Sequence, residues 1–188
     1  MEFHGQIDRR QQKTRLAIYR AFSSLLMEKS FAAITVQDII DEANVGRSTF
    51  YSHFSTKEDL IDGLCKEIFS HVFSEPEGPG ADHDFSHSRY NIDDELAHIL
   101  YHLRSSSDLI IPMISSDCSE MFLRHYRTEL AGIFSKDEDG TDDFWTFMLI
   151  GGFVETSRWY LSHVEMTPES AVEMFMEVYG RLLPDERS

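Results

Sequence analysis

The stretch TVQDIIDEANVGRSTFYSHFSTKEDL occupies residues 35–60 and holds two short helical segments separated by a turn. Apolar residues recur at helical spacing in the first segment and predict a helix over residues 36–43. Asn44-Val45-Gly46 predicts a tight turn, because Asn and Gly tolerate the left-handed backbone that ends one helix before the next begins. A second short helix follows over residues 47–53. Two short helices joined by a turn of about three residues are typical of a helix-turn-helix.

Further helices are expected on both sides of this pair. An apolar stripe that begins at Ile18 predicts a helix over about residues 9–29. Thr35, with Asp38 three residues later, resembles a capping box at the start of the helix over residues 36–43. Ser55-Thr56-Lys57-Glu58 is expected to cap another helix that continues to about residue 72.

The helix over residues 47–53 has two distinct faces. Phe50 and Phe54 lie four residues apart, so both point inward, and Arg47 then stands at the exposed N-terminal end. The outward face carries small hydroxyl groups and one aromatic ring, namely Ser48, Thr49, Tyr51 and Ser52. Hydroxyl groups and helix N-termini bind phosphates, and a guanidinium in the major groove pairs with guanine. This face is therefore a candidate DNA-contacting surface.

Charge is distributed unevenly along the 188 residues, which have a net charge of -16. Residues 1–66 hold nine Lys or Arg and nine Asp or Glu, whereas residues 67–188 hold eight and twenty-four. Five cations and no anion lie in residues 9–20. Such a split indicates two tasks, with polyanion contact confined to the N-terminal part. A solvated helix face explains the basic cluster equally well.

The rest of the chain also has helical periodicity, and the fold class is therefore all-α. The helices are expected near residues 91–105, 108–114, 118–135, 142–163 and 168–183. Residues 74–88 concentrate Pro, Gly and charge, which predicts a mobile loop. We expect a DNA-binding domain over residues 1–56 and a helical ligand-binding and dimerisation domain over residues 57–188.

The composition also bears on compartment and on chemistry. Cys65 and Cys118 are far apart and form no metal-ligand spacing, which argues against a disulfide framework or a zinc finger. Apolar runs are too short for a membrane span, and the first residues lack the apolar region of a secretory signal. A cytoplasmic protein with no cofactor and no membrane partner is expected.

Residues 35–60 resemble the DNA-binding segment of the TetR family of transcriptional regulators, and the resemblance extends back through IYRAFSSLLMEKSF at residues 18–31. It covers about the first third of the chain. The resemblance implies backbone contacts to DNA from Thr35, Tyr51, His53 and Lys57, and base-edge contacts from Arg47, Ser48 and Thr49. Tyr51 and His53 could instead pack within the protein, and Lys57 could be solvated. The chain departs from the family at Ser30 and Asn44, where Gly is usual, and at Gly46, where a cap hydroxyl is often found.

One helix-turn-helix makes too few contacts for a specific affinity, so a homodimer on operator DNA is expected, formed through the two C-terminal helices. The candidate contact positions have helical spacing: Phe147, Gly151, Val154, Arg158, Ala171, Val172, Phe175, Met176 and Tyr179. Gly151-Gly152 in the middle of a helix indicates either a close helix approach or a kink without function.

The family resemblance also implies a pocket for a small-molecule effector in the acidic part. Candidate wall residues combine aromatic, Met and His side chains: His98, Tyr101, His102, Met113, Met121, Phe122, His125, Tyr126, Trp145, Met148 and Trp159. Plain core packing explains such side chains too, but buried polar tips need a partner.

The sequence also bears on two other chemistries, metal binding and catalysis. Glu95, His98 and His102 share one helix side, but they match no established metal motif. The sequence contains no phosphate loop and no nucleophile motif, so an enzyme is not expected. The favoured hypothesis is a repressor that a small molecule releases from its operator by shifting the helix that begins near Lys57. The alternative is a helix-turn-helix module that binds proteins or buffers a ligand and never contacts DNA.

Overall fold

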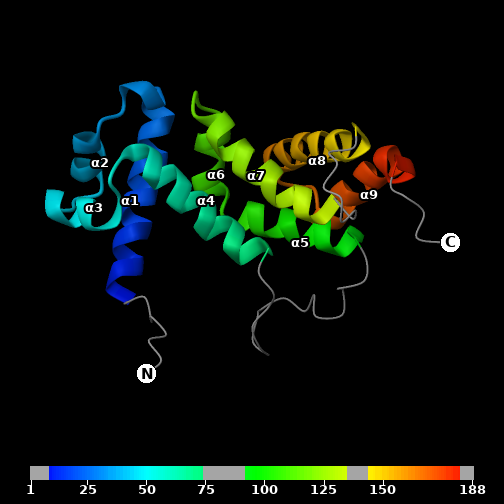
Figure 1. Ribbon diagram of the computed structural model, residues 1–188, viewed down its shortest axis with the longest axis horizontal. Coiled ribbons are helices and arrows are strands. Elements are labelled where there is room, and N and C mark those ends of the chain that lie inside the picture. Colours follow the sequence, from blue (N-terminus) through cyan, green and yellow to red (C-terminus); the bar gives the residue numbers. More distant parts are fainter. Residues whose placement is uncertain (1–8, 74–91, 135–143, 183–188) are drawn as a thin grey trace. The chain divides into compact units, whose positions relative to one another are not determined.

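The computed structural model describes residues 9–73, 92–134 and 144–182. Within these ranges all regular elements are helices, which confirms the predicted all-α class (Figure 1). The expected loop over residues 74–88 lies outside the described residues. No helix in the described part is long and apolar enough to cross a bilayer.

The helices follow the sequence expectation closely. They are α1 (Arg9–Glu28), η1 (Phe31–Ala33), α2 (Val36–Glu42), α3 (Arg47–His53), α4 (Lys57–Phe73), α5 (Ile92–Ser105), α6 (Ser107–Ile114), α7 (Ser119–Phe134), α8 (Phe144–Ser162), α9 (Pro168–Tyr179) and η2 (Gly180–Leu182), where η marks a 3₁₀ turn. No sequence pattern indicates η1, and the helix expected over residues 168–183 changes to the 3₁₀ turn η2 after Tyr179.

The described residues pack into two compact units. The N-terminal unit contains the residues up to Leu64 together with Asp108–Phe122, and the C-terminal unit contains Cys65–Ser107 and the residues from Leu123 onward. Helices α4 and α7 contribute residues to both units. The expected division into functional domains at residues 56 and 57 stays a prediction.

The N-terminal unit is built around aromatic side chains from α1 and α3. Tyr19 and Phe54 pack with their ring centroids 5.6 Å apart, and Phe22 is fully buried one turn further along α1. Gly63 on α4 permits this arrangement, because a Cβ there would lie 3.1 Å from both the Phe54 ring and the Tyr19 hydroxyl oxygen. Each such aromatic burial stabilises the fold by roughly 1.5 to 3 kcal/mol.

The turn between α2 and α3 corrects one detail of the expectation. Asn44 has φ 50°, so it adopts the predicted left-handed backbone. Gly46 has φ -74° and ψ 150°, which is an extended N-cap conformation open to any residue. Asn44 is therefore the residue of this turn with left-handed backbone, a conformation that Asn tolerates better than most residues do because its side chain is short and polar.

The C-terminal unit packs α5, α8 and α9 together. The Phe153 and Phe175 rings lie 5.2 Å apart between α8 and α9. Gly152 allows the closest approach, because a Cβ at this position would lie 2.8 Å from Cζ of Tyr179. The close-approach interpretation of the Gly pair thus holds for Gly152, whereas a Cβ on Gly151 would meet nothing within 4 Å.

Candidate nucleic-acid interface

The predicted orientation of α3 is confirmed. Phe50 is 0% exposed and Phe54 is also buried, and their ring centroids lie 5.8 Å apart. On the other side of the helix Arg47, Ser48, Tyr51 and Ser52 are exposed, while Thr49 is half-buried. Helix α3 therefore presents a polar outer face on a rigid aromatic base.

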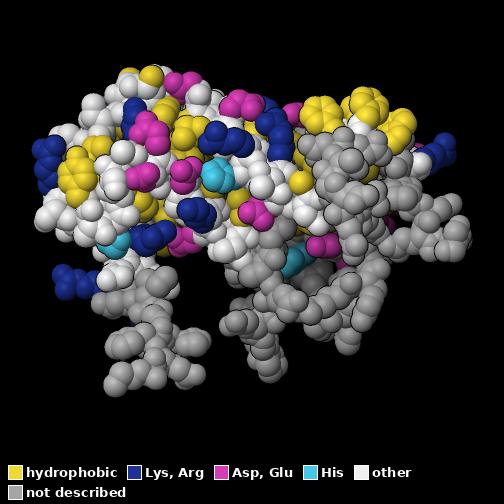
Figure 2. Space-filling model, viewed as in Figure 1, with side chains coloured by type: hydrophobic (Ala, Val, Ile, Leu, Met, Phe, Trp, Pro, Cys, Tyr) yellow, Lys and Arg dark blue, Asp and Glu magenta, His cyan; other side chains and the backbone are white. Residues whose placement is uncertain are grey.

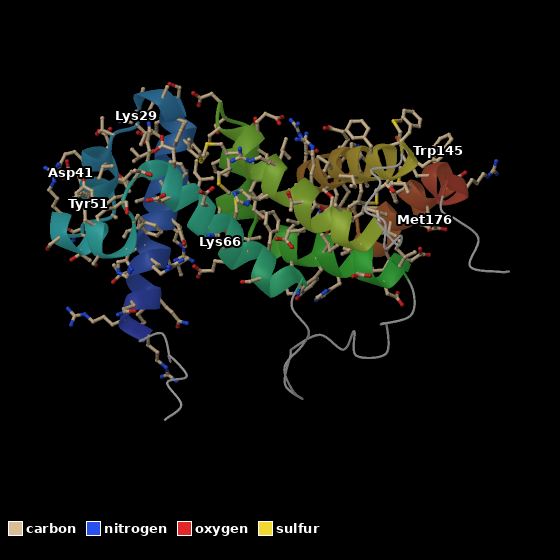
Figure 3. All side chains as sticks on the ribbon, in the orientation of Figure 1. Lys29, Asp41, Tyr51, Lys66, Trp145 and Met176 are labelled. Carbon is tan, nitrogen blue, oxygen red and sulfur yellow. The ribbon has the colours of Figure 1, made fainter. Side chains whose placement is uncertain are left out.

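Arg47 and Tyr51 are coupled on that outer face. The guanidinium carbon of Arg47 lies 5.8 Å from the centroid of the Tyr51 ring, a cation–π arrangement one helical turn apart. Tyr51, labelled in Figure 3, is an exposed side chain, and 46% of its surface is accessible. The ring thus orients the guanidinium outward while leaving both groups accessible.

Thr35 begins α2 with a complete capping box. Its Oγ1 accepts a hydrogen bond from the Asp38 amide at 3.1 Å, and its own amide donates to Oδ2 of Asp38 at 2.7 Å. The Lys29 ammonium, 2.9 Å from the same Oδ2, together with bonds from Thr35 lowers the pKa of Asp38 to about 2. Thr35 is exposed, but its hydroxyl group already donates to Asp38 at 2.7 Å.

Lys57 has an intramolecular environment that the sequence did not indicate. Its ammonium group donates to the carbonyl oxygens of Phe31 at 2.7 Å and Ile34 at 2.9 Å, with Ala32 at 3.5 Å. The same nitrogen lies 4.3 Å from the centroid of the Phe31 ring. These contacts engage the donors that a phosphate would require, so Lys57 holds η1 in place before α2.

His53 lies at the end of α3 and is half-buried. Desolvation, followed by the nearby charge of Arg15, lowers the pKa of its imidazole. Arg15 on α1 donates to the Tyr19 hydroxyl at 2.7 Å and has its guanidinium 5.5 Å from the Phe54 ring centroid. His53 is therefore neutral near pH 7 and offers a hydrogen bond rather than a charge to a ligand.

The sequence analysis missed Asp117, which lies between α6 and α7. Its Oδ1 accepts from the Phe31 amide at 2.6 Å and its Oδ2 from the Ala32 amide at 3.3 Å. The Phe31 bond is the main reason that the pKa of Asp117 is lowered. No local signal could have identified this contact, because 86 residues separate Asp117 from Phe31.

The candidate effector residues are divided between the two units. Met113, Met121 and Phe122 belong to the N-terminal unit, and the others belong to the C-terminal unit. Tyr101, Trp145 and Met148 are exposed, and Met113, Phe122, Tyr126 and His102 are buried. His98, Met121, His125 and Trp159 are half-buried. The assignment of these residues to an effector site stays a prediction.

Two polar pairs lie within the C-terminal unit, the first partly buried and the second buried. The Nε2 atoms of His98 and His102 are 2.7 Å apart, and His102 is 4% exposed. The Tyr126 hydroxyl oxygen lies 2.8 Å from Oγ of Ser157, and burial raises the pKa of Tyr126. In the described part of the chain no three metal-ligating side chains are placed to hold an ion.

Several of the residues expected at the dimer interface are buried within the chain. Val154, Ala171, Val172 and Phe175 are buried inside the chain itself, because α9 packs its apolar face on α5 and α8. Phe147, also among the expected positions, is exposed, and other large apolar side chains on α8 and α9 are exposed as well: Phe144, Trp145, Met148, Met174 and Val178. Figure 2 shows apolar side chains gathered over α8, and Figure 3 labels Trp145 among them. We call these six residues the C-terminal apolar stripe.

Sequence comparisons match the N-terminal part of the chain. The family model described as "Bacterial regulatory proteins, tetR family" matches residues 18–64. YxbF of Bacillus subtilis (strain 168), an uncharacterized HTH-type transcriptional regulator, is 43% identical over 76 residues, which are 38% of this chain and 20% of the relative. DhaS of Lactococcus lactis subsp. lactis (strain IL1403), an HTH-type dhaKLM operon transcriptional activator, is 29% identical over 62 residues, 33% of each chain. The matches thus span between a fifth and a third of these two curated relatives.

Solved structures match nearly the whole chain. A crystal structure described as a TetR transcriptional regulator from Streptococcus agalactiae 2603V is 36% identical, with a TM-score of 0.64, over 92% of this chain and 96% of that one. A structure from Syntrophomonas wolfei str. Goettingen shares the fold with a TM-score of 0.62 at 16% identity, covering 92% of this chain and 95% of its own. The first match combines near-complete coverage with high identity. On this evidence, and with the helix-turn-helix geometry of α2 and α3, the chain belongs to the TetR family of DNA-binding transcriptional regulators.

Proposed function

We propose that this chain is a ligand-responsive repressor that leaves its operator when a small molecule binds the C-terminal unit. The observation that carries the proposal is the outer face of α3, where polar side chains stand on the buried Phe50 and Phe54 rings. Membership of a family of regulators, which are not enzymes, directs the proposal toward binding rather than catalysis.

The DNA contacts are assigned by chemistry. Arg47, whose guanidinium lies beside the Tyr51 ring, is proposed to pair bidentately with guanine, and Ser48 and Thr49 are proposed to contact base edges next to it. Tyr51 and His53 are proposed to contact the phosphate backbone, which fixes register but not sequence. Thr35 is proposed to join them by exchanging its hydroxyl bond to Asp38 for a bond to a phosphate oxygen. Lys57 contributes indirectly by holding η1, since three carbonyl groups already occupy its ammonium.

A homodimer through α8 and α9 is the proposed binding species. The C-terminal apolar stripe supports it, because large exposed apolar side chains gathered on a surface, as Figure 2 shows over α8, mark interaction sites. A two-fold dimer places two recognition helices on half-sites about one turn of DNA apart and doubles the contacts.

The proposed effector site uses the buried polar groups of the C-terminal unit. His98, His102 and Tyr126 combine hydrogen-bonding tips with aromatic surroundings, the composition typical of a small-molecule site. Of the other sequence candidates, Trp145 and Met148 now fit the dimer surface better, because both belong to the exposed stripe.

Coupling is proposed to run through α4, which has residues in both units. A change in α4 would alter the placement of the recognition helices and mismatch the half-sites. A coupling free energy of about 2 to 3 kcal/mol gives roughly 30- to 150-fold release of the operator.

Selection of duplexes from a random library with the wild-type chain tests the DNA assignment, followed by anisotropy titration of the selected and a scrambled duplex at several salt concentrations. Sequence preference with a steep salt slope supports regulation. A chain that enriches no duplex contradicts it and favours the protein-interaction alternative. A reporter driven by the selected duplex then separates repression from activation, the activity in the name of the relative DhaS.

A further inference from the structure

We propose that Asp117 is a positioning residue for DNA binding, which holds the 3₁₀ turn before α2 and thereby places operator affinity under the control of the α6–α7 link. The proposal rests on the assignment of α2 and α3 to DNA. It adds to α4 a second route by which the C-terminal part of the chain can act on the recognition helix.

The first step is that two side chains, Asp117 and Lys57, hold η1 by hydrogen bonds. The Asp117 carboxylate accepts hydrogen bonds from the amides of Phe31 and Ala32. The Lys57 ammonium occupies the carbonyl oxygens of the same two residues. One three-residue turn is thus held by an anion at its amides and a cation at its carbonyls, both with charge-assisted bonds.

The second step leads from η1 to the recognition helices. Lys57 also binds the carbonyl of Ile34, the buried residue immediately before the Thr35 cap of α2. The start of α2 is in turn fixed by the Thr35–Asp38 capping box. Since α2 and α3 are joined only by a short turn, the placement of η1 sets the placement of both helices.

The third step connects Asp117 to the rest of the chain. It lies in the link between α6 and α7, which is closed by its own hydrogen bonds: Oγ of Ser116 donates to the Met113 carbonyl at 2.9 Å, and the Ser119 amide donates to the Ser116 carbonyl at 3.2 Å. Helix α7 begins at Ser119 and continues into the C-terminal unit from Leu123. A displacement of α7 therefore moves Asp117 relative to the Phe31 and Ala32 amides.

The mechanism predicts an effect on the binding-competent fraction of the protein. Without the carboxylate, η1 and α2 sample more orientations, and apparent operator affinity falls in proportion to the competent fraction. Simple electrostatics predicts the opposite sign, because removal of an anion strengthens binding to a polyanion. The two explanations are therefore distinguishable by direction.

The test uses the full chain and the duplex that the wild type selects. Asp117→Asn keeps one acceptor and Asp117→Ala keeps none, so operator affinity should fall by several-fold in the first and by about tenfold or more in the second. Affinity for scrambled duplex should not fall. Asp108→Asn is the matched control: it removes the same charge from α6, where Asp108 is exposed and lies 3.9 Å from Arg20, and it should change operator affinity less than twofold.

A second readout separates positioning from general destabilisation. Hydrogen exchange of the Phe31 and Ala32 amides should accelerate in both Asp117 variants, at a temperature where circular dichroism shows the chain folded, and remain unchanged in Asp108→Asn. Operator affinity of Asp117→Ala equal to that of Asp108→Asn, or unchanged exchange at both amides, would overturn the role of Asp117 alone. A wild-type chain that selects no duplex would overturn the DNA assignment and this role together.

Discussion

The guanidinium group of Arg104 stacks on the ring of Tyr160, with 3.6 Å between Cζ and the ring centroid. Its nitrogens also donate to carbonyl groups where α8 ends: Nη1 to Val164 at 2.9 Å and Met166 at 3.0 Å, and Nη2 to His163 at 3.0 Å and to Tyr160. The last carbonyls of a helix have no partner within it, so one side chain from α5 completes the end of α8 and the turn toward α9.

Arg104→Met should lower the free energy of unfolding by about 2 to 4 kcal/mol, because several carbonyls lose a charged donor at once. Urea unfolding followed by circular dichroism measures the change. Arg124→Met, at an exposed position on α7, is the control and should remain within about 0.5 kcal/mol of wild type. Similar values for the two variants would contradict a structural role for Arg104.

Substitution by Ala should change the free energy of unfolding in opposite directions at the two adjacent glycines of α8. Gly151→Ala adds a methyl group that meets nothing within 4 Å and should stabilise the helix by about 0.5 to 1 kcal/mol. Gly152→Ala places a Cβ 2.8 Å from the Tyr179 ring and should destabilise by about 1 to 3 kcal/mol. Thermal unfolding of both variants checks the pair, and a stabilised Gly152→Ala would mean that Tyr179 moves aside without cost.

Arg47→Ala should weaken binding to the selected duplex by about 1 to 3 kcal/mol and relax the preference at one base pair. Lys13→Ala removes an exposed cation on α1 and should weaken binding to specific and random duplex alike. Anisotropy titrations on single-base variants of the duplex provide the measurement. Equal losses from Arg47→Ala on specific and random duplex would remove its assigned base-reading role.

Phe147→Glu should convert the proposed dimer to a monomer of 21.8 kDa, because Phe147 is 68% exposed and belongs to the C-terminal apolar stripe. Met27→Glu also introduces a carboxylate at an exposed apolar position, on α1, and its mass in solution should equal that of the wild type. Sedimentation equilibrium distinguishes the two. A dimeric Phe147→Glu variant would place the interface elsewhere.

Asp38 should contribute to the acid sensitivity of the fold. Its folded pKa of about 2 lies below the ordinary value of 3.8, so its contribution to stability is present above pH 3.8 and is lost as the pH falls through about 2. Asp38→Asn should therefore flatten the dependence of the urea midpoint on pH between about 4 and 2. Asp41→Asn removes the same charge from α2 without the bonds to Lys29 and Thr35 and is the matched control, and equal slopes for the two variants would contradict the role of Asp38.

Local patterns were sufficient for the helix-turn-helix. The Thr35–Asp38 cap, the left-handed Asn44 and the inward pair Phe50 and Phe54 depend on residues within one or two turns of each other. Helical periodicity and backbone preference act over that range, so the sequence by itself determined the all-α class and the outward face of α3.

Contacts between distant segments were decided only by the tertiary structure. In the sequence Lys57 resembles an ordinary cation in the first turn of a helix. In the structure its ammonium contacts three carbonyl groups in and next to η1, and Phe31 lies 26 residues away in sequence. In the sequence Asp117 resembles an ordinary loop acid. In the structure its carboxylate accepts a hydrogen bond from the Phe31 amide, 86 residues away in sequence. Helical periodicity identifies the apolar positions of α9 but not the neighbouring helix that covers each of them. In the structure α9 packs on α5 and α8, and its exposed apolar residues, including Met174 and Val178, are not the ones expected at the dimer interface. Hydrophobic burial has no direction of its own, so the choice of partner for each face emerges only when the helices are assembled.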